Sequence, residues 1–179
     1  ANVDGVPRDI PAADWGTYFG ELRLLVDGDA KIQIDAADLV SLNTYYGSAP
    51  EDGVLDLFLS RPWMRTTQGE DASGYGTKGG MSSFSLEMDL KAGQTFNKVE
   101  VYAVQTPGRA FGAHYRLQRY VHNQGVTGQA EIADIVRGPY AMMALHVATG
   151  DIGDVEVHAD QRKVIEYDSV IRNTHLKRA

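Results

Sequence analysis

The chain has 179 residues, with 43% hydrophobic and 23% charged residues and a formal net charge of −7 at pH 7. This composition is typical of a folded protein, and the acidic balance argues against a surface that wraps nucleic acid. The sequence contains no cysteine and no long apolar run, which excludes disulfides and cysteine zinc sites and predicts no membrane-spanning helix.

The first predicted element is a β-hairpin. Residues 18–26 and 31–34 are rich in strand-forming side chains. Between them, Asp27-Gly28 has the residue types that a tight two-residue turn requires. The pattern therefore predicts two antiparallel strands that are close neighbours in the sheet.

A short helix is expected next, over residues 35–47. Asp35 is placed to cap its N-terminus, and Asp38 adds negative charge to the first turn. Gly47 suits the left-handed residue that ends many helices. The apolar stripe of this helix consists of Leu39, Leu42 and Tyr46.

The segment 53–60 predicts a mostly apolar strand, and the polar, glycine-rich segment 66–80 predicts a long surface loop. From Ser83 onward, apolar and polar residues alternate with a period of two, which indicates a half-buried strand. The side chains expected on its buried face are Phe84, Leu86, Met88 and Leu90. Those expected on its polar face are Ser83, Ser85, Glu87 and Asp89. A charge at Leu86 is accordingly expected to abolish folding.

Several more strands and one more helix are expected toward the C-terminus. The predicted strands are residues 99–104, 115–121, 129–135, 140–148 and 155–158. The last segment, "KVIEYDSVIRNTHLKRA", predicts a strand followed by a helix. Many short strands, glycine-rich turns and two short helices together indicate an all-β chain.

An internal repeat links the two ends of the chain. Residues 21–40 align with residues 154–173 without a gap, at an offset of 133. Both blocks have a strand, an acidic turn, a strand and an Asp-capped helix. We interpret this as a duplication that produced two related β domains in tandem. The second block stops before any counterpart of 53–104, so we expect a fragment, with both domains incomplete.

The glycine-rich stretch "GYGTKGG" (74–80) resembles a phosphate-binding loop but lacks its context. In a Walker A motif, Ser or Thr follows the lysine and a helix follows the loop. Here Lys78 precedes Gly79, and a strand comes next. A dinucleotide site would likewise need its glycines to open a helix. The stretch is therefore interpreted as a flexible loop that leads into a strand.

No constellation of catalytic or cofactor-binding residues emerges from the remaining polar side chains. The histidines lie apart, at His114, His122, His146, His158 and His175. His146, in an apolar run, is expected in the interior. The carboxylate pairs Asp27 with Asp29 and Glu70 with Asp71 could hold structural calcium, but no pair fits an EF-hand loop. Solvated acidic turns are the favoured interpretation, and no metal ligand is assigned.

The aromatic residues fit a core or an interface better than a platform for stacked bases, because basic residues do not accompany them. They include Tyr45, Tyr46, Trp63, Phe84 and Tyr102. An alternative function follows from other aromatics: a carbohydrate- or ligand-binding β-sandwich of a secreted enzyme or adhesin. Its sugar platforms would be Trp15, Trp63 and Tyr75. A cupin-like enzyme is disfavoured, because its metal needs clustered histidines.

A family resemblance rests on the order of several stretches from residue 18 onward. The most specific are "GYGTKGGMSSFSLEMDL" and "QAEIADIVRGPYAMMALHV", accompanied by "LRLLVDGDAKIQIDAADLVSLNTYYG" and "IGDVEVHADQRKVIEY". In this order they resemble the major capsid protein of corticovirus-type phages, which are tailless and icosahedral and contain an internal membrane. The family's full chains are longer than the region matched.

The resemblance implies a double jelly-roll, two eight-stranded β-sandwich barrels in one chain. The first roll would occupy residues 1–106, the linker 107–114 and the second roll 115–179, with terminal strands missing at both ends. It also implies a structural virion protein without catalysis, whose three chains form a pseudo-hexagonal capsomer. Expected partners are further copies, neighbouring capsomers and vertex or membrane proteins of the virion, without direct contact to nucleic acid.

Overall fold

The computed structural model of the chain contains two compact units, Ala1–Ile135 and Val136–Ala179. The residues that it describes are 2–3, 6–7, 9–61, 66, 68–69, 73–94, 96, 98–112, 114–123, 128–133, 135, 141, 144–147 and 153–167. Their regular elements are mostly β-strands with a few short helices, which is consistent with the expected all-β class. The domain boundaries expected near residues 106 and 115 stay a prediction.

Ten regular elements are present in the described part of the chain. In chain order they are β1 (Asn2–Val3), β2 (Val6–Pro7), the 3₁₀ helix η1 (Ala12–Asp14), α1 (Trp15–Tyr18), β3 (Phe19–Val26), β4 (Asp29–Asp35), α2 (Ala36–Tyr45), β5 (Phe84–Leu90), β6 (Val155–Ala159) and β7 (Arg162–Tyr167). The short helices η1 and α1 are absent from the sequence-based prediction, because no apolar period is visible over so few residues.

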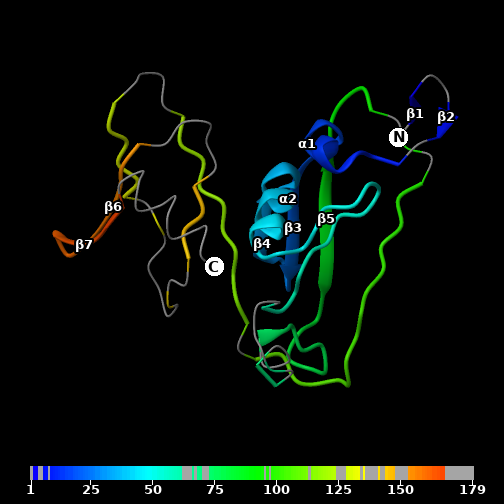
Figure 1. The fold of residues 1–179 in the computed structure, drawn as a ribbon. Helices are drawn as coiled ribbons and strands as arrows, with labels where there is room; N and C mark the ends of the chain where they lie inside the picture. The colour runs from blue at the N-terminus through cyan, green and yellow to red at the C-terminus, as the bar shows by residue number, and fades with distance from the viewer. Residues whose placement is uncertain are drawn as a thin grey trace. The chain divides into compact units, whose positions relative to one another are not determined.

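The first unit contains an antiparallel sheet of three strands in the order β4-β3-β5 (Figure 1). The predicted hairpin joins β3 to β4. Its turn residues Asp27 and Gly28 have φ angles of 51° and 79°, the left-handed conformation that a type I′ turn demands at both positions. Asp27 also accepts hydrogen bonds from the backbone N–H groups of Ser82 (2.6 Å) and Ser83 (2.8 Å), which fixes the start of β5 beside the turn.

Helix α2 follows β4 directly and lies across the β3–β4 part of the sheet (Figure 1). The predicted N-cap is confirmed: Asp35 has an extended backbone, and its carboxylate accepts a hydrogen bond from the Ala37 N–H at 3.0 Å. The predicted end is also confirmed, since Gly47 has a φ of 87°. Leu39 from the predicted stripe is buried against the sheet.

Asp35→Ala is expected to lower the free energy of unfolding of the first unit by about 0.5–2 kcal/mol. The reason is that one backbone N–H in the first turn of α2 loses its acceptor. Asp35→Asn is the matched control, because an amide oxygen can replace the carboxylate in the cap. Chemical denaturation compares the two variants. Equal destabilisation by both would contradict a capping role.

The core of the first unit lies between the β3–β4 hairpin, α1 and α2. Phe19 of β3 is 1% exposed, and its ring stacks between Trp15, at a centroid distance of 5.3 Å, and Phe96, at 5.0 Å. Ile32 of β4 is fully buried. The other buried apolar residues are Ile10, Leu22, Leu24, Val26, Ile34, Ala36 and Leu39.

The β6–β7 hairpin of the second unit repeats the β3–β4 hairpin in register as well as in sequence. Leu24 pairs with Ile32 and Leu25 with Ala30, so a bulge lies between the two pairs. At the offset of 133, Val157 pairs with Ile165 and His158 with Lys163, with the bulge at the same place. The turn residues Asp160 and Gln161 have positive φ angles of 48° and 62°, as their counterparts Asp27 and Gly28 do. The predicted repeat is therefore confirmed for this hairpin.

Other predicted strands are not strands in the structure. Residues 99–104 have no strand pairing. In 53–60 only Val54 forms an isolated bridge, to Glu51, and in 115–121 only Leu117 does, to Ile32. The described residues of 129–135 and 140–148 form no strand either. The physical reason is that a β-prone segment becomes a strand only where an edge is available to pair with it. The helix predicted after β7 falls outside the described residues.

In the part of the chain that the structure describes, no helix has the length and apolar character needed to cross a membrane.

Candidate functional site

A network of ion pairs covers the polar face of the β4-β3-β5 sheet. Arg23, in the central strand, contacts three carboxylates: Glu21 at 3.1 Å, Glu87 at 3.3 Å and Asp89 at 2.7 Å. Arg119 adds a contact to Glu21 at 3.3 Å. The predicted polar face of β5 therefore meets the charges of β3. This network links neighbouring strands across the sheet. Each of its charged groups is paired with a group of opposite charge.

The charges in this network shift the pKa values of their partners. Partial burial raises the pKa of Glu21, but hydrogen bonds from Gln33, Arg119 and Arg23 outweigh that effect, so the pKa lies below its usual value. The charge of Asp89 raises the pKa of Arg23 further. Both shifts favour the charged forms, which is the behaviour of ion-paired groups rather than of a general acid or base.

The apolar face of β5 is only partly covered. In register, Leu86 lies opposite Leu24 and Phe84 opposite Val26, so the predicted orientation toward the core side of the sheet is confirmed. The predicted burial is confirmed in part only for Met88, which is half-buried against the core. It is wrong for Phe84, Leu86 and Leu90, which are exposed, with 39% of Leu86 accessible. The core helices α1 and α2 pack on β3 and β4, and the edge strand β5 lies beyond them.

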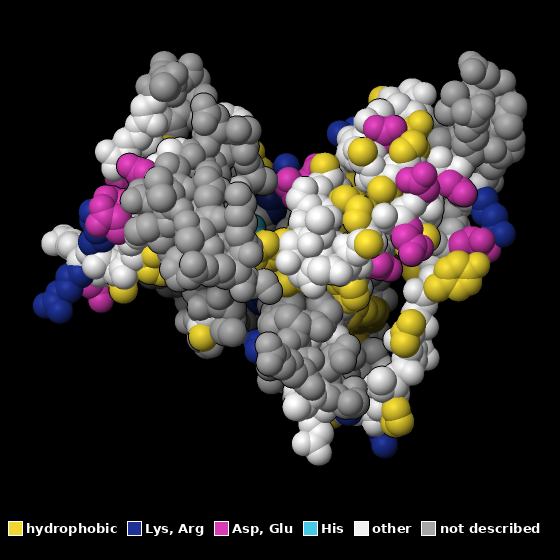
Figure 2. Space-filling view, viewed as in Figure 1, with side chains coloured by type: hydrophobic (Ala, Val, Ile, Leu, Met, Phe, Trp, Pro, Cys, Tyr) yellow, Lys and Arg dark blue, Asp and Glu magenta, His cyan; other side chains and the backbone are white. Residues whose placement is uncertain are grey.

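More apolar surface follows directly along the chain. In the segment 98–106, four large hydrophobic side chains are exposed: Val99, Val101, Tyr102 and Val104. Figure 2 shows apolar side chains at the surface of the molecule, interspersed with acidic ones. We call the exposed side chains of β5 and of 98–106 the apolar surface of the first unit. Exposed apolar side chains that gather on a protein surface are typical of an interface, so these residues are the candidates for one in the first unit.

Leu86→Asp is now expected to leave the first unit folded, in contrast to the expectation from sequence. The charge can reach water because the side chain is 39% exposed. Leu24→Asp is the matched variant on the paired strand; its side chain is buried, and it is expected to unfold the unit. Circular dichroism during thermal unfolding compares the two. A cooperative transition in Leu24→Asp would contradict this core assignment.

The glycine-rich loop 74–80 is a packing site for the segment 108–111. The backbone N–H of Lys78 donates to the Arg109 carbonyl at 2.8 Å, and the Arg109 guanidinium donates to the Gly74 carbonyl. A Cβ on Gly76 would lie 2.1 Å from the carbonyl oxygen of Ala110, so only glycine permits this approach. The glycines therefore serve backbone packing, which agrees with the rejection of a phosphate site. We call this contact the loop clasp.

Aromatic residues gather beside the loop clasp. Tyr75 contacts the rings of Phe84, Phe111, His114 and Tyr115. The Tyr75 hydroxyl donates to the Tyr115 carbonyl at 2.6 Å, and burial raises the pKa of Tyr75. The sugar platform proposed at Tyr75 is therefore occupied by other side chains of the chain.

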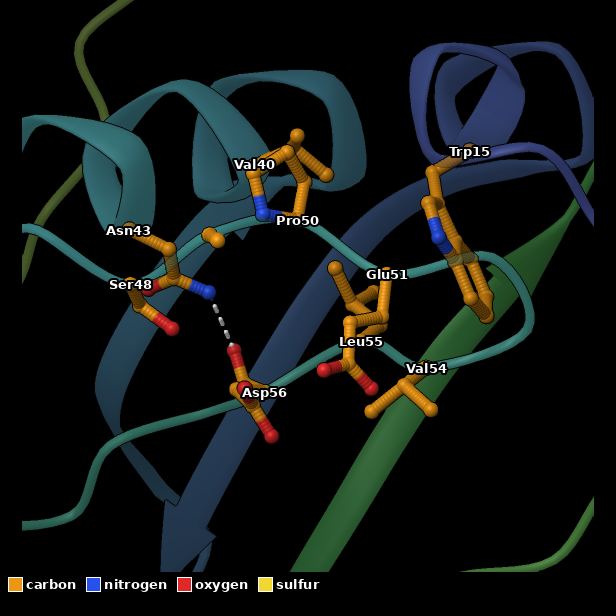
Figure 3. A pocket seen from close by; sticks show the side chains of 10 residues that line it. Trp15, Val40, Asn43, Ser48, Pro50, Glu51, Val54, Leu55 and Asp56 are labelled. Carbon is orange, nitrogen blue, oxygen red and sulfur yellow. Dashed lines mark hydrogen bonds between the residues drawn. The ribbon is translucent and has the colours of Figure 1, made fainter.

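A shallow groove lies between α2 and residues 48–56 (Figure 3). Asn43 from α2 donates to the Asp56 carbonyl across it at 2.8 Å, as the dashed line marks (Figure 3). The Trp15 ring lines the far end of the groove but is itself buried. A sugar platform at Trp15 is thus ruled out by packing, while Trp63 falls outside the described residues. The groove is therefore the seam along which α2 packs against residues 48–56, and it is not a binding site.

The acidic candidates for calcium have other partners in the structure. Asp27 accepts the two backbone N–H groups at the start of β5, and Asp29 pairs with Lys31 at 2.6 Å and with Arg116 at 3.3 Å. The Lys31 hydrogen bond is the main reason that the pKa of Asp29 is lowered. Among the described residues, no group of three or more metal-ligating side chains occurs. Glu70 and Asp71 are not described.

None of the four described histidines belongs to a group of three or more metal-ligating side chains. His114 lies in the aromatic cluster, His122 is exposed and His158 hydrogen-bonds to Glu156 at 3.0 Å. His146 is exposed, so the prediction of an interior position is wrong. Its neighbours Leu145 and Val147 are exposed too, because no described strand covers this apolar run. His175 falls outside the described residues.

Comparison with known proteins points to one family. Residues 17–106, half of the chain, match the family described as "Viral coat protein P2 N-terminal domain". The match spans α2 and all three strands of the β4-β3-β5 sheet. No curated protein matches the chain significantly, and no solved structure does.

Proposed function

The chain belongs to the viral coat protein P2 family through its N-terminal domain, and from this premise we propose that it is the major capsid subunit of a membrane-containing icosahedral phage. A member of a coat protein family is a structural protein of the capsid, located in the virion. The single observation that carries the proposal is the family match over residues 17–106. The phage type rests on the resemblance of the full sequence pattern.

Two equivalent hairpins support a double jelly-roll. The β3–β4 and β6–β7 hairpins share register, bulge and left-handed turn at a constant offset. Duplication of a whole β domain is the simplest cause of such agreement, because a bulge position is a specific structural feature. In this proposal the first hairpin belongs to one roll and the second to the other.

The apolar surface of the first unit supports self-assembly. Its large hydrophobic side chains lie in the edge strand β5 and in the segment 98–106. Stable interfaces bury about 800 Å² on each partner around an apolar centre. We propose that this surface lies between neighbouring chains of a trimeric capsomer. Three chains around one axis would give the pseudo-hexagonal outline expected of two rolls per chain.

A structural role needs no reacting group. The polar network on the sheet consists of mutually neutralised ion pairs, and the sugar platforms proposed at Trp15 and Tyr75 are packed by the chain itself. These contacts support a coat subunit over the carbohydrate-binding alternative. The proposal includes calcium only as a structural ion, without assigned ligands.

Sedimentation velocity of the wild-type chain and of Leu86→Asp tests the proposal. The wild-type chain is expected to form trimers and larger shells, visible by negative-stain electron microscopy. Leu86→Asp is expected to stay folded and to assemble at least tenfold more weakly, because the charge lies in the apolar surface. Ser41→Asp, which adds the same charge at an exposed position of α2 outside the apolar surface, is the control and should assemble as the wild type does. Unchanged assembly of Leu86→Asp would contradict the proposed interface.

A further inference from the structure

The segment 116–119 lies against the outer edge of β4, on the side away from β3. There the Gln33 N–H donates to the Leu117 carbonyl at 2.8 Å, and the Leu117 N–H donates to the Lys31 carbonyl at 2.9 Å. These two hydrogen bonds form the parallel bridge between Ile32 and Leu117. The segment is therefore a short parallel addition to the β4-β3-β5 sheet, and we call residues 116–119 the strap.

Two arginines of the strap contact the acidic residues at the two ends of β4. Arg116 contacts the Asp29 carboxylate at 3.3 Å. Arg119 contacts Asp35 at 3.9 Å and Glu21 of β3 at 3.3 Å. Glu21 belongs to the ion-pair network of the sheet, so the strap is tied to that network by charge as well as to β4 by its backbone.

Tyr115, the residue before the strap, is fixed by contacts of its own. Its hydroxyl donates to the Phe58 carbonyl, and its backbone carbonyl accepts the Tyr75 hydroxyl at 2.6 Å. The side chains of Tyr75 and Tyr115 both pack against the core of the first unit. Tyr115 therefore provides a fixed point from which the strap can detach without disturbing the residues before it.

The contacts of the strap are weaker than those within the sheet. β3 and β4 share six residue pairs, whereas the strap, which lies wholly within the described residues, shares one with β4. The side chains of Asp29 and Arg119 are 55% and 34% exposed, so salt screens their ion pairs. Leu117 adds one half-buried apolar side chain against the core, which favours the closed position. Segments held by so few buried contacts open locally while the surrounding fold persists.

We propose that the strap is a conformational device with two positions, closed on β4 in the isolated chain and open where a chain must reach farther within the shell. When the strap opens, the free chain begins after Tyr115 instead of after Arg119. Four more extended residues span up to about 14 Å. This inference rests on the proposed capsid function, in which identical chains must fit surroundings that are not identical. Packed elements meet such a demand by switching between discrete arrangements.

Hydrogen exchange at the Leu117 and Gln33 amides measures the opening, because both N–H groups lie in the bridge. In the double variant Arg116→Ala with Arg119→Ala, both amides should exchange at least tenfold faster than in the wild type, while exchange in β3 stays slow. Sodium chloride at about 1 M should accelerate the same two amides of the wild type. Arg162→Ala, at an exposed position of β7, is the control and should change neither. Unchanged exchange in the double variant would overturn the proposal.

A disulfide between the strap and β4 tests whether assembly uses the open position. Gln33 and Gln118 lie one residue beyond the bridge in the same register. Neighbouring strands lie about 4.7–4.9 Å apart, within the Cα range of about 4.4–6.8 Å for a disulfide. The sequence contains no cysteine, so Gln33→Cys with Gln118→Cys supplies one pair of thiols. One oxidised glutathione converts them to a disulfide and leaves as two reduced glutathione molecules. Gln33→Cys alone is the control.

The oxidised double-cysteine variant should form trimers but no closed shells, and reduction with dithiothreitol should restore the shells. Shells that are the same before and after reduction would overturn the two-position device and leave the coat function standing. Failure of the intrachain disulfide to form would show that the strap does not lie on β4. If the wild type forms neither trimers nor shells, the proposed function is wrong and with it the use of the strap in a shell, and the exchange experiment still decides whether the strap opens.

Discussion

Phe19→Ala is expected to lower the free energy of unfolding of the first unit by about 3–5 kcal/mol. The Phe19 ring is 1% exposed and lies between the rings of Trp15 and Phe96. Its removal leaves a cavity that neither neighbour can fill without losing its own contacts. Urea denaturation followed by tryptophan fluorescence measures the change, because the Trp15 indole lies against the substituted side chain.

Tyr102→Ala is the control for this experiment. Its side chain is 84% exposed in the segment 98–106, so the isolated chain should change in stability by no more than about 0.5 kcal/mol. A loss below about 1 kcal/mol for Phe19→Ala, similar to that of the control, would contradict the position of the core. Phe19→Leu should fall between the two, since it keeps part of the apolar volume.

Gly76→Ala is expected to open the loop clasp and to destabilise the first unit by about 1–3 kcal/mol. The new Cβ would lie 2.1 Å from the oxygen of Ala110 and 2.6 Å from its carbonyl carbon. Both are backbone atoms, so the segment 108–111 must move away. The hydrogen bond from Lys78 N–H to the Arg109 carbonyl is then lost. Thermal unfolding and limited digestion with trypsin, which cleaves after Arg109, report the two effects.

Gly112→Ala separates steric collision from the general effect of replacing a glycine. Its Cβ would have its nearest heavy atom 4.0 Å away, at the Ala110 oxygen, so the segment need not move. We expect wild-type stability and slow cleavage after Arg109 in this variant. If Gly112→Ala and Gly76→Ala were digested at the same rate, the loop clasp would not hold the segment 108–111.

Local signals made the hairpin and the helix of the first unit predictable. Asp27-Gly28 demanded a left-handed turn, and Asp35 and Gly47 marked both ends of a helix; the backbone angles and the cap hydrogen bond agree. Each of these features depends on residues within one or two turns of chain. The repeat could also be found, because strand register and bulge position follow from the same short sequence in both copies.

Strand pairing over long distances was not predictable from local patterns. The segments 53–60 and 99–104 have the composition of strands but no ladder in the described structure. Leu55, Leu57 and Leu59 nevertheless pack against the core, so their alternation indicated burial correctly. Whether an extended segment joins a sheet depends on a free edge that other parts of the chain, or other chains, must provide.

The candidate sites also depend on contacts between residues far apart in the sequence, which local patterns do not predict. The position of the β5 side chains relative to the sheet could be inferred from their period, but their exposure depends on which helix covers which strand. The role of Gly76 depends on a segment more than thirty residues away, and no glycine pattern predicts that partner. The polar network around Arg23 became visible only with the register of β5 against β3.

The native mass of the purified chain, by light scattering on a sizing column, tests the central claim most directly. The account predicts a species of three times the 19.6 kDa of the chain, or a larger multiple of three, at concentrations where a coat subunit assembles. A stable monomer over the same range of concentrations would contradict a self-assembling capsid subunit. A dimer that never grows would contradict the trimeric capsomer.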